Sequence, residues 1–130
     1  MGLFGKKKQE EPDLHEKRYA IPYSKHFRGF KKYHVTVYGY EEAMKNNKYF
    51  CSIPLDDLNV EFVCLDMTDR VKPKRMAKVF INGLNVGAIF ESGEPKKIAD
   101  IENGEIVAVH VEKDENEQRL KFFVKYRDVI

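Results

Sequence analysis

The stretch MAKVFINGLNVGAIF, residues 76–90, has the pattern of a β-hairpin. The pair Asn82-Gly83 separates two apolar runs, and both residues tolerate the positive φ that a two-residue type I′ turn requires. Such a turn places six apolar side chains on one face, which we expect to be core: Ile81 with Leu84, Val79 with Val86, and Ala77 with Ala88.

Further strands are predicted wherever apolar and polar residues alternate. These segments are 34–38, 58–65, 106–111 and 119–127, and helix formers favour two short helices over 40–47 and 95–104. Helices this short and few cannot supply the crossovers of a parallel sheet. The predicted fold class is therefore mainly β (α+β): a small, mostly antiparallel β-barrel or strongly curled sheet of six to seven strands with two short helices.

Length and composition predict one domain after a tail. A chain of 130 residues, 42% of them hydrophobic, can bury a core without metals or disulfides. Residues 1–18 have no periodicity and contain a lysine triplet, so we expect a disordered tail there and a single β-rich domain over 19–130. No apolar run is long enough to cross a membrane. Cys51 and Cys64 form no disulfide framework, which favours a reducing, cytoplasmic location.

Catalytic and metal-binding patterns do not occur in this sequence. There is no GxSxG, HExxH or phosphate-binding glycine loop, so we expect no enzyme, no cofactor and no metal. His26, His34 and His110 lack the converging partners of a zinc site and are interpreted as surface polar groups.

Two basic constellations remain as candidate binding residues. The first lies within residues 70–90, which carry five basic and no acidic side chains: Arg70, Lys72, Lys74, Arg75 and Lys78. The second is one face of the strand predicted over 119–127, with an aromatic ring among four cations: Arg119, Lys121, Phe123, Lys125 and Arg127. Cations at repeating intervals suit phosphates and an aromatic ring suits a stacked base, so this pattern favours single-stranded nucleic acid. The alternative is a solvated face, because charges on an edge strand also prevent aggregation.

Three segments resemble the HIRAN domain, a small β-barrel module found attached to helicase-like and nuclease proteins and alone in bacteria. The segment VTVYG at 35–39 is similar to its opening strand, residues 60–65 to its second strand, and residues 77–89 to its closing hairpin. The resemblance spans roughly residues 30–90. It implies a β-barrel that binds DNA, particularly free single-stranded ends.

Two functions from different classes follow from these patterns. The first is a non-catalytic nucleic-acid-binding accessory module. The second is a protein-interaction or scaffold domain of a bacterial or mobile-element system, in which the basic residues only keep strands soluble. The two differ in whether 70–78 and 119–127 share one face: opposite faces, each paired with acidic residues, would favour the scaffold.

Overall fold

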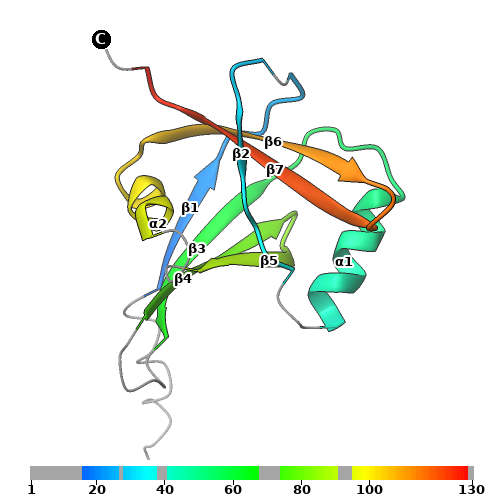
Figure 1. Cartoon of the computed structure of the whole chain (residues 1–130), viewed down its shortest axis with the longest axis horizontal. Coiled ribbons are helices and arrows are strands. Elements are labelled where there is room, and N and C mark those ends of the chain that lie inside the picture. Colours follow the sequence, from blue (N-terminus) through cyan, green and yellow to red (C-terminus); the bar gives the residue numbers. More distant parts are fainter. Residues whose placement is uncertain (1–15, 27, 38–40, 68–73, 91–94, 129–130) are drawn as a thin grey trace, which may run out of the picture.

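The computed structural model describes residues 16–26, 28–37, 41–67, 74–90 and 95–128, and these contain seven strands and two helices (Figure 1). In chain order the elements are β1 (Lys17–Ile21), β2 (Lys31–Tyr33), α1 (Glu41–Cys51), β3 (Val60–Met67), β4 (Lys74–Ile81), β5 (Leu84–Phe90), α2 (Pro95–Glu102), β6 (Ile106–Asp114) and β7 (Arg119–Tyr126). The predicted mainly β class with two short helices is confirmed. The expected tail lies almost wholly outside the described residues.

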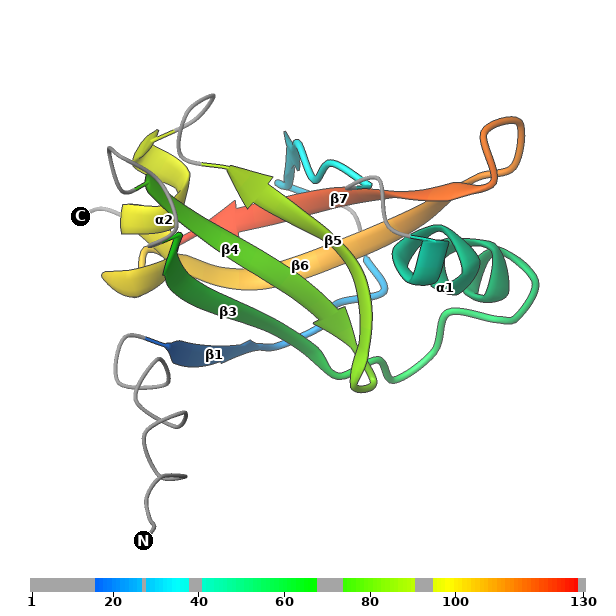
Figure 2. The same cartoon turned by 90° about the horizontal axis from the view of Figure 1, so that it is seen from below.

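The strands form two antiparallel sheets that cross one another. One has the order β1-β3-β4-β5 and the other β2-β7-β6. Isolated bridges connect their edges, a parallel one between Tyr23 and Val109 and an antiparallel one between Thr36 and Ala88. The described strands do not close into one continuous barrel, and the result is the strongly curled arrangement. Figures 1 and 2 show α1 and α2 at opposite ends of the two sheets.

The core lies between the two sheets. Phe62 and Val79 from the first sheet and Phe122 and Val124 from the second belong to one buried cluster, which Phe50 of α1 also joins. Alternate side chains of these strands thus enter the core, as period two requires, and some side chains of the opposite faces, such as Val63, are buried as well. The outer faces of the two sheets point in opposite directions.

The hairpin at 76–90 forms as predicted near its turn and differs farther away. Ile81 pairs with Leu84, and Asn82 has a φ of 51°, as the turn requires, although Leu84 is exposed and not part of the core as expected. The register then shifts between Val79 and Phe80, so Val79 pairs with Gly87 rather than Val86. A β-bulge adds one residue to β5. Every pair beyond it is offset by one, so that part of the predicted register is wrong.

The strand predicted at 34–38 is present only as a single bridge. Regular pairing in this part of the chain covers β2, Lys31–Tyr33, against β7. Thr36 instead crosses the edge of β5 and exchanges two backbone hydrogen bonds with Ala88. A Cβ on Gly87 would lie 2.6 Å from the Thr36 carbonyl oxygen, so this crossing requires glycine.

Both helices are fastened to the sheets by polar contacts. In α1 the buried Asn47 side chain bonds to the backbone of β5 and β7. In α2, Asp100 accepts a hydrogen bond from the Tyr126 hydroxyl, and the Lys97 carbonyl accepts one from Tyr33. Within the described part of the chain, neither helix is long and apolar enough to cross a membrane.

Candidate nucleic-acid interface

The two basic constellations lie on different sheets. Lys78 alternates with the buried Ala77 and Val79, so it points away from the core on the outer face of β1-β3-β4-β5. The residues of 119–127 belong to β2-β7-β6, whose outer face points the other way. Arg70, Lys72 and the side chain of Lys74 lie outside the described residues. The side chains that are described therefore do not form one continuous surface.

Arg75 is held by two carboxylates. Its Nε donates to Asp66 Oδ1 at 3.0 Å, and its Nη1 donates to Glu102 Oε1 at 2.6 Å. These hydrogen bonds, that to Glu102 first, raise the pKa of the guanidinium above its ordinary value. The guanidinium thereby ties α2 to the neighbouring ends of β3 and β4. We assign Arg75 a structural role, contrary to its place among the candidate binding residues.

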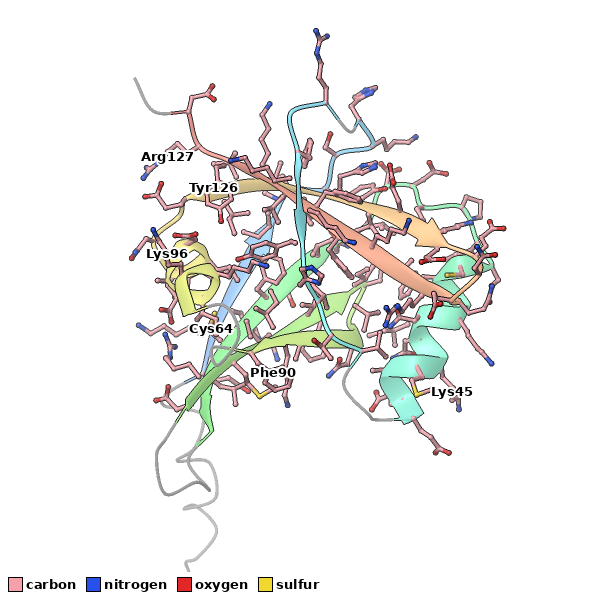
Figure 3. All side chains as sticks on the ribbon, viewed as in Figure 1. Lys45, Cys64, Phe90, Lys96, Tyr126 and Arg127 are labelled. Carbon is pink, nitrogen blue, oxygen red and sulfur yellow. The ribbon has the colours of Figure 1, made fainter. Side chains whose placement is uncertain are left out.

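Arg127 makes a similar contact just beyond the same, C-terminal end of α2. Its Nη2 donates to Glu105 Oε2 at 2.7 Å, and its backbone N–H donates to the Glu105 carbonyl at 2.7 Å. Figure 3 shows Arg127 and Tyr126 together at the end of β7, beside the helix that carries Lys96. This pair closes the turn into β6 and leaves Arg127 off the centre of the face.

The outer face of β2-β7-β6 carries cations whose side chains have no ion pair. Lys121 and Lys125 are exposed on β7, and Lys32 is exposed on β2, where it pairs in register with Phe123. No carboxylate in the described part of the chain lies within ion-pair distance of these three lysines. Glu112 is opposite Lys121 in the register, but its Oε2 lies 3.2 Å from His110 Nε2. This face, defined by Lys32, Lys121 and Lys125, is called the basic face below.

Phe123 lies on the same side of β7 as these lysines, yet it is buried. Its exposed fraction is 9%, and its ring centroid is 6.0 Å from that of His110. A ring packed in this way cannot offer an open face to a base. The expectation that Phe123 is the stacking residue is therefore corrected.

His110 is also buried rather than a surface group, with 6% exposed. Its Nδ1 lies 2.8 Å from the Ser24 carbonyl oxygen, and its ring stacks on Tyr23 at 6.3 Å. Phe30 contacts the same ring at 5.9 Å. Residues 22–26 and 28–30, between β1 and β2, thus cover part of this face and are together called the segment 22–30.

The segment 22–30 is held by backbone bonds as well. Val109 donates to the Pro22 carbonyl at 2.9 Å, and Ser24 donates to the Val109 carbonyl at 2.8 Å. Nearby, burial raises the pKa of Tyr23, whose hydroxyl donates to the Leu55 carbonyl. Contacts of side chains and backbone together hold the segment 22–30 over Phe123.

A pocket opens between the segment 22–30 and the basic face. Its volume is about 460 Å³, and its lining residues are Ser24, His26, Arg28, Gly29, Phe30, Ala108 and Lys125. Gly29 has a φ of 80°, a left-handed turn conformation that glycine adopts without strain. The half-buried Phe30 thus shares a cavity with Arg28 and Lys125. We call this cavity the Phe30 pocket.

A smaller hollow lies at the opposite end of the basic face, where the chain leaves β2. It measures about 100 Å³, and Lys32, His34, Arg119 and Lys121 are among its lining residues. Asp114 also lines it, opposite Arg119 in the register. Lysine and arginine side chains thus line both cavities of the basic face, and Asp114 is the one carboxylate among these lining residues.

The sequence identified the lysines of β7 but missed Arg28, Phe30 and Lys32. Arg28 and Phe30 lie in a segment without strand periodicity, and nothing local indicates that it folds over β6 and β7. The described residues contain no group of three or more His, Cys, Asp or Glu side chains arranged to hold a metal ion. Comparisons with known protein families, curated proteins and solved structures found no match to this chain.

Proposed function

We propose that this protein is a non-catalytic nucleic-acid-binding module that holds a single strand against the basic face. The observation that carries the proposal is the placement of Lys32, Lys121 and Lys125 beside a pocket that contains Phe30 and Arg28. Cations that form no ion pair with another described residue are available to phosphates, and binding them releases the counterions of the nucleic acid. An aromatic ring beside them supports stacking of an unpaired base. An activity of this kind is also what the HIRAN resemblance implies.

Phe30 replaces Phe123 as the proposed stacking residue. Both rings contact His110, but Phe30 is half-buried and lines an open cavity, whereas Phe123 is buried beneath the segment 22–30. Substituting Phe30 with Ala should weaken binding by about 1–3 kcal/mol, the usual value of one stacked base, with little dependence on salt. Substituting Phe123 with Ala should instead destabilise the fold.

The electrostatic part is tested by fluorescence anisotropy with a labelled oligothymidylate at several salt concentrations. The double variant Lys121→Ala, Lys125→Ala should lower the slope of log affinity against log salt by about 1.4, at roughly 0.7 per phosphate contact. The matched control is Lys45→Ala, Lys96→Ala, which removes the same charge from α1 and α2, away from the basic face (Figure 3). Equal losses in the two double variants would show attraction to overall charge and not to this face.

The affinity of the unmodified protein for the oligonucleotide decides whether the proposal stands. Ordinary non-specific association with nucleic acid has a dissociation constant of about 1–100 μM at physiological salt. No binding up to about 100 μM protein in low salt would be weaker than that association, and the nucleic-acid function would then be rejected.

A protein-interaction or scaffold role is the second candidate. Its support is that the two sequence constellations lie on opposite sheets and that Arg75 and Arg127 are paired with carboxylates. The lysines of the basic face, which form no ion pair with any residue that the structure describes, favour the first candidate. For either one we infer a reducing, cytoplasmic location, because Cys51 and Cys64 are buried free thiols.

A further inference from the structure

The lysines of the basic face repeat at an interval that matches a nucleic-acid backbone. Lys121 and Lys125 are four residues apart on β7, so roughly 13 Å separates them at about 3.3 Å per residue. Lys32 lies beside the midpoint, because its register partner is Phe123. An extended single strand spaces its phosphates by about 7 Å, roughly twice the 3.4 Å per nucleotide of a duplex strand. Three consecutive phosphates therefore fit over the three lysines.

The two cavities differ in what they can hold. The Phe30 pocket, at the Lys125 end, has about 460 Å³ and falls within the roughly 300–1,000 Å³ usual for ligand pockets. The hollow at the Lys121 end has about 100 Å³, too small for a base, and its lining holds Lys32, Arg119 and Lys121 against one carboxylate, Asp114, so it suits an anionic group. The basic face thus has one end that can hold a base and another that can hold a phosphate.

Resting on the proposed function, we propose that three consecutive phosphates of one strand lie over Lys125, Lys32 and Lys121 in turn, and that the base next to Lys125 enters the Phe30 pocket. The ligand is single-stranded, because a paired base cannot enter the pocket. The site covers four nucleotides, since four nucleotides contain three linking phosphates.

A length series tests the site size. Unlabelled oligothymidylates of two, three, four, six and eight nucleotides compete with a labelled longer one in low salt. Affinity should rise several-fold with each nucleotide up to four, and beyond four only by the number of registers in which the oligomer can bind. A constant gain per nucleotide through eight would contradict a four-nucleotide site.

A double-mutant cycle tests whether Lys32 contacts the central phosphate. One change is made in the protein and the other in the ligand. In a tetranucleotide, the central phosphate is replaced by a neutral methylphosphonate, and binding is measured to the unmodified protein and to Lys32→Ala. The replacement should cost the unmodified protein about threefold in affinity, the value of one exposed ion pair, and should cost Lys32→Ala almost nothing. Lys45→Ala, on α1, is the matched control and should retain the full effect.

The outcomes separate the two proposals. Failure of the longer oligothymidylate to bind rejects the proposed function. Binding without a plateau at four nucleotides, or with equal methylphosphonate effects in the unmodified protein and Lys32→Ala, rejects only the placement of the strand. Inorganic tripolyphosphate, added as a competitor, should compete less well than the tetranucleotide because it has no base for the Phe30 pocket, and equal competition would contradict the role of that pocket.

Discussion

Asn47 is a buried polar side chain that joins three elements, and we expect its replacement by Ala to cost much of the stability. It is 1% exposed. Its Nδ2 donates to the carbonyls of Ala43 and Val86 at 2.8 Å each, and its Oδ1 accepts from the Leu120 N–H at 2.9 Å. One amide therefore connects α1 to one strand of each sheet, the edge strand β5 and the central strand β7.

The cost follows from the groups that Asn47→Ala leaves behind. The Ala43 carbonyl belongs to the helix and keeps the backbone N–H of residue 47 as a partner. The Val86 carbonyl and the Leu120 N–H lose this partner in a buried position, at about 1–3 kcal/mol each. We therefore expect a loss of about 4 kcal/mol, out of a total of roughly 5–15 kcal/mol for a domain.

Urea unfolding followed by circular dichroism measures this loss. With a slope of about 1.5 kcal/mol per molar, a loss of about 4 kcal/mol moves the midpoint by roughly 2.5 M. Asn46→Ala is the matched control, because it removes one half-buried bond to the Asn85 carbonyl and should cost about 1 kcal/mol. Equal midpoint shifts for the two variants would refute the reasoning.

A third variant tests the two hydrogen bonds that Asn47 Nδ2 donates. Asn47→Asp keeps an oxygen for the Leu120 N–H but turns an acceptor toward the carbonyls of Ala43 and Val86. It should be at least as unstable as Asn47→Ala at pH 7. Because burial against carbonyls raises the pKa of that carboxyl in the folded state, its stability should improve as the pH falls and the group becomes protonated.

Three further predictions concern single positions. Burial raises the pKa of the Cys64 thiol to about 12, so little thiolate forms at pH 8, and Ellman's reagent should modify Cys64 only after unfolding in urea. Gly87→Ala should cost roughly 2 kcal/mol or more by urea unfolding, because its Cβ meets the Thr36 oxygen, whereas Gly83→Ala, in open space, should cost about 1–2 kcal/mol from its positive φ alone. Arg75→Lys cannot bridge both carboxylates and should lower the unfolding free energy by about 2 kcal/mol in the same assay.

Much of the fold could be predicted because its signals are local. The Asn82-Gly83 turn, the alternation in 119–127 and the helix over 95–102 each depend on neighbouring residues, and all appear in the structure. The bulge in β5 could not be predicted in the same way. It lies beside the crossing of Thr36 at Gly87, a contact between segments about fifty residues apart. Long-range contacts of this kind have no local pattern.

The same distinction explains the errors at the candidate site. Alternation alone places Phe123 and His110 on the outer face of their sheet, and both do lie there. Their burial comes from the segment 22–30, which reaches them through nonlocal contacts to Val109. One signal was present in the sequence: a large aromatic side chain within a charged strand face is costly to expose, so Phe123 between two lysines suggests a covered position.

The distribution of carboxylates decides which cations of this nearly neutral chain are free to bind a ligand. The formal net charge is only +2, and residues 91–118 are rich in acids. In the folded protein several of those acids gather around α2, where Glu102 and Glu105 neutralise Arg75 and Arg127. On β6, Glu112 lies beside His110, and Asp114 is opposite Arg119. Folding therefore places the pairs of Arg75 and Arg127 at the α2 end and leaves the lysines of the basic face without ion-pair partners among the described residues. The alternation in 119–127 indicates the lysines of β7, but which cations are neutralised depends on contacts between distant segments.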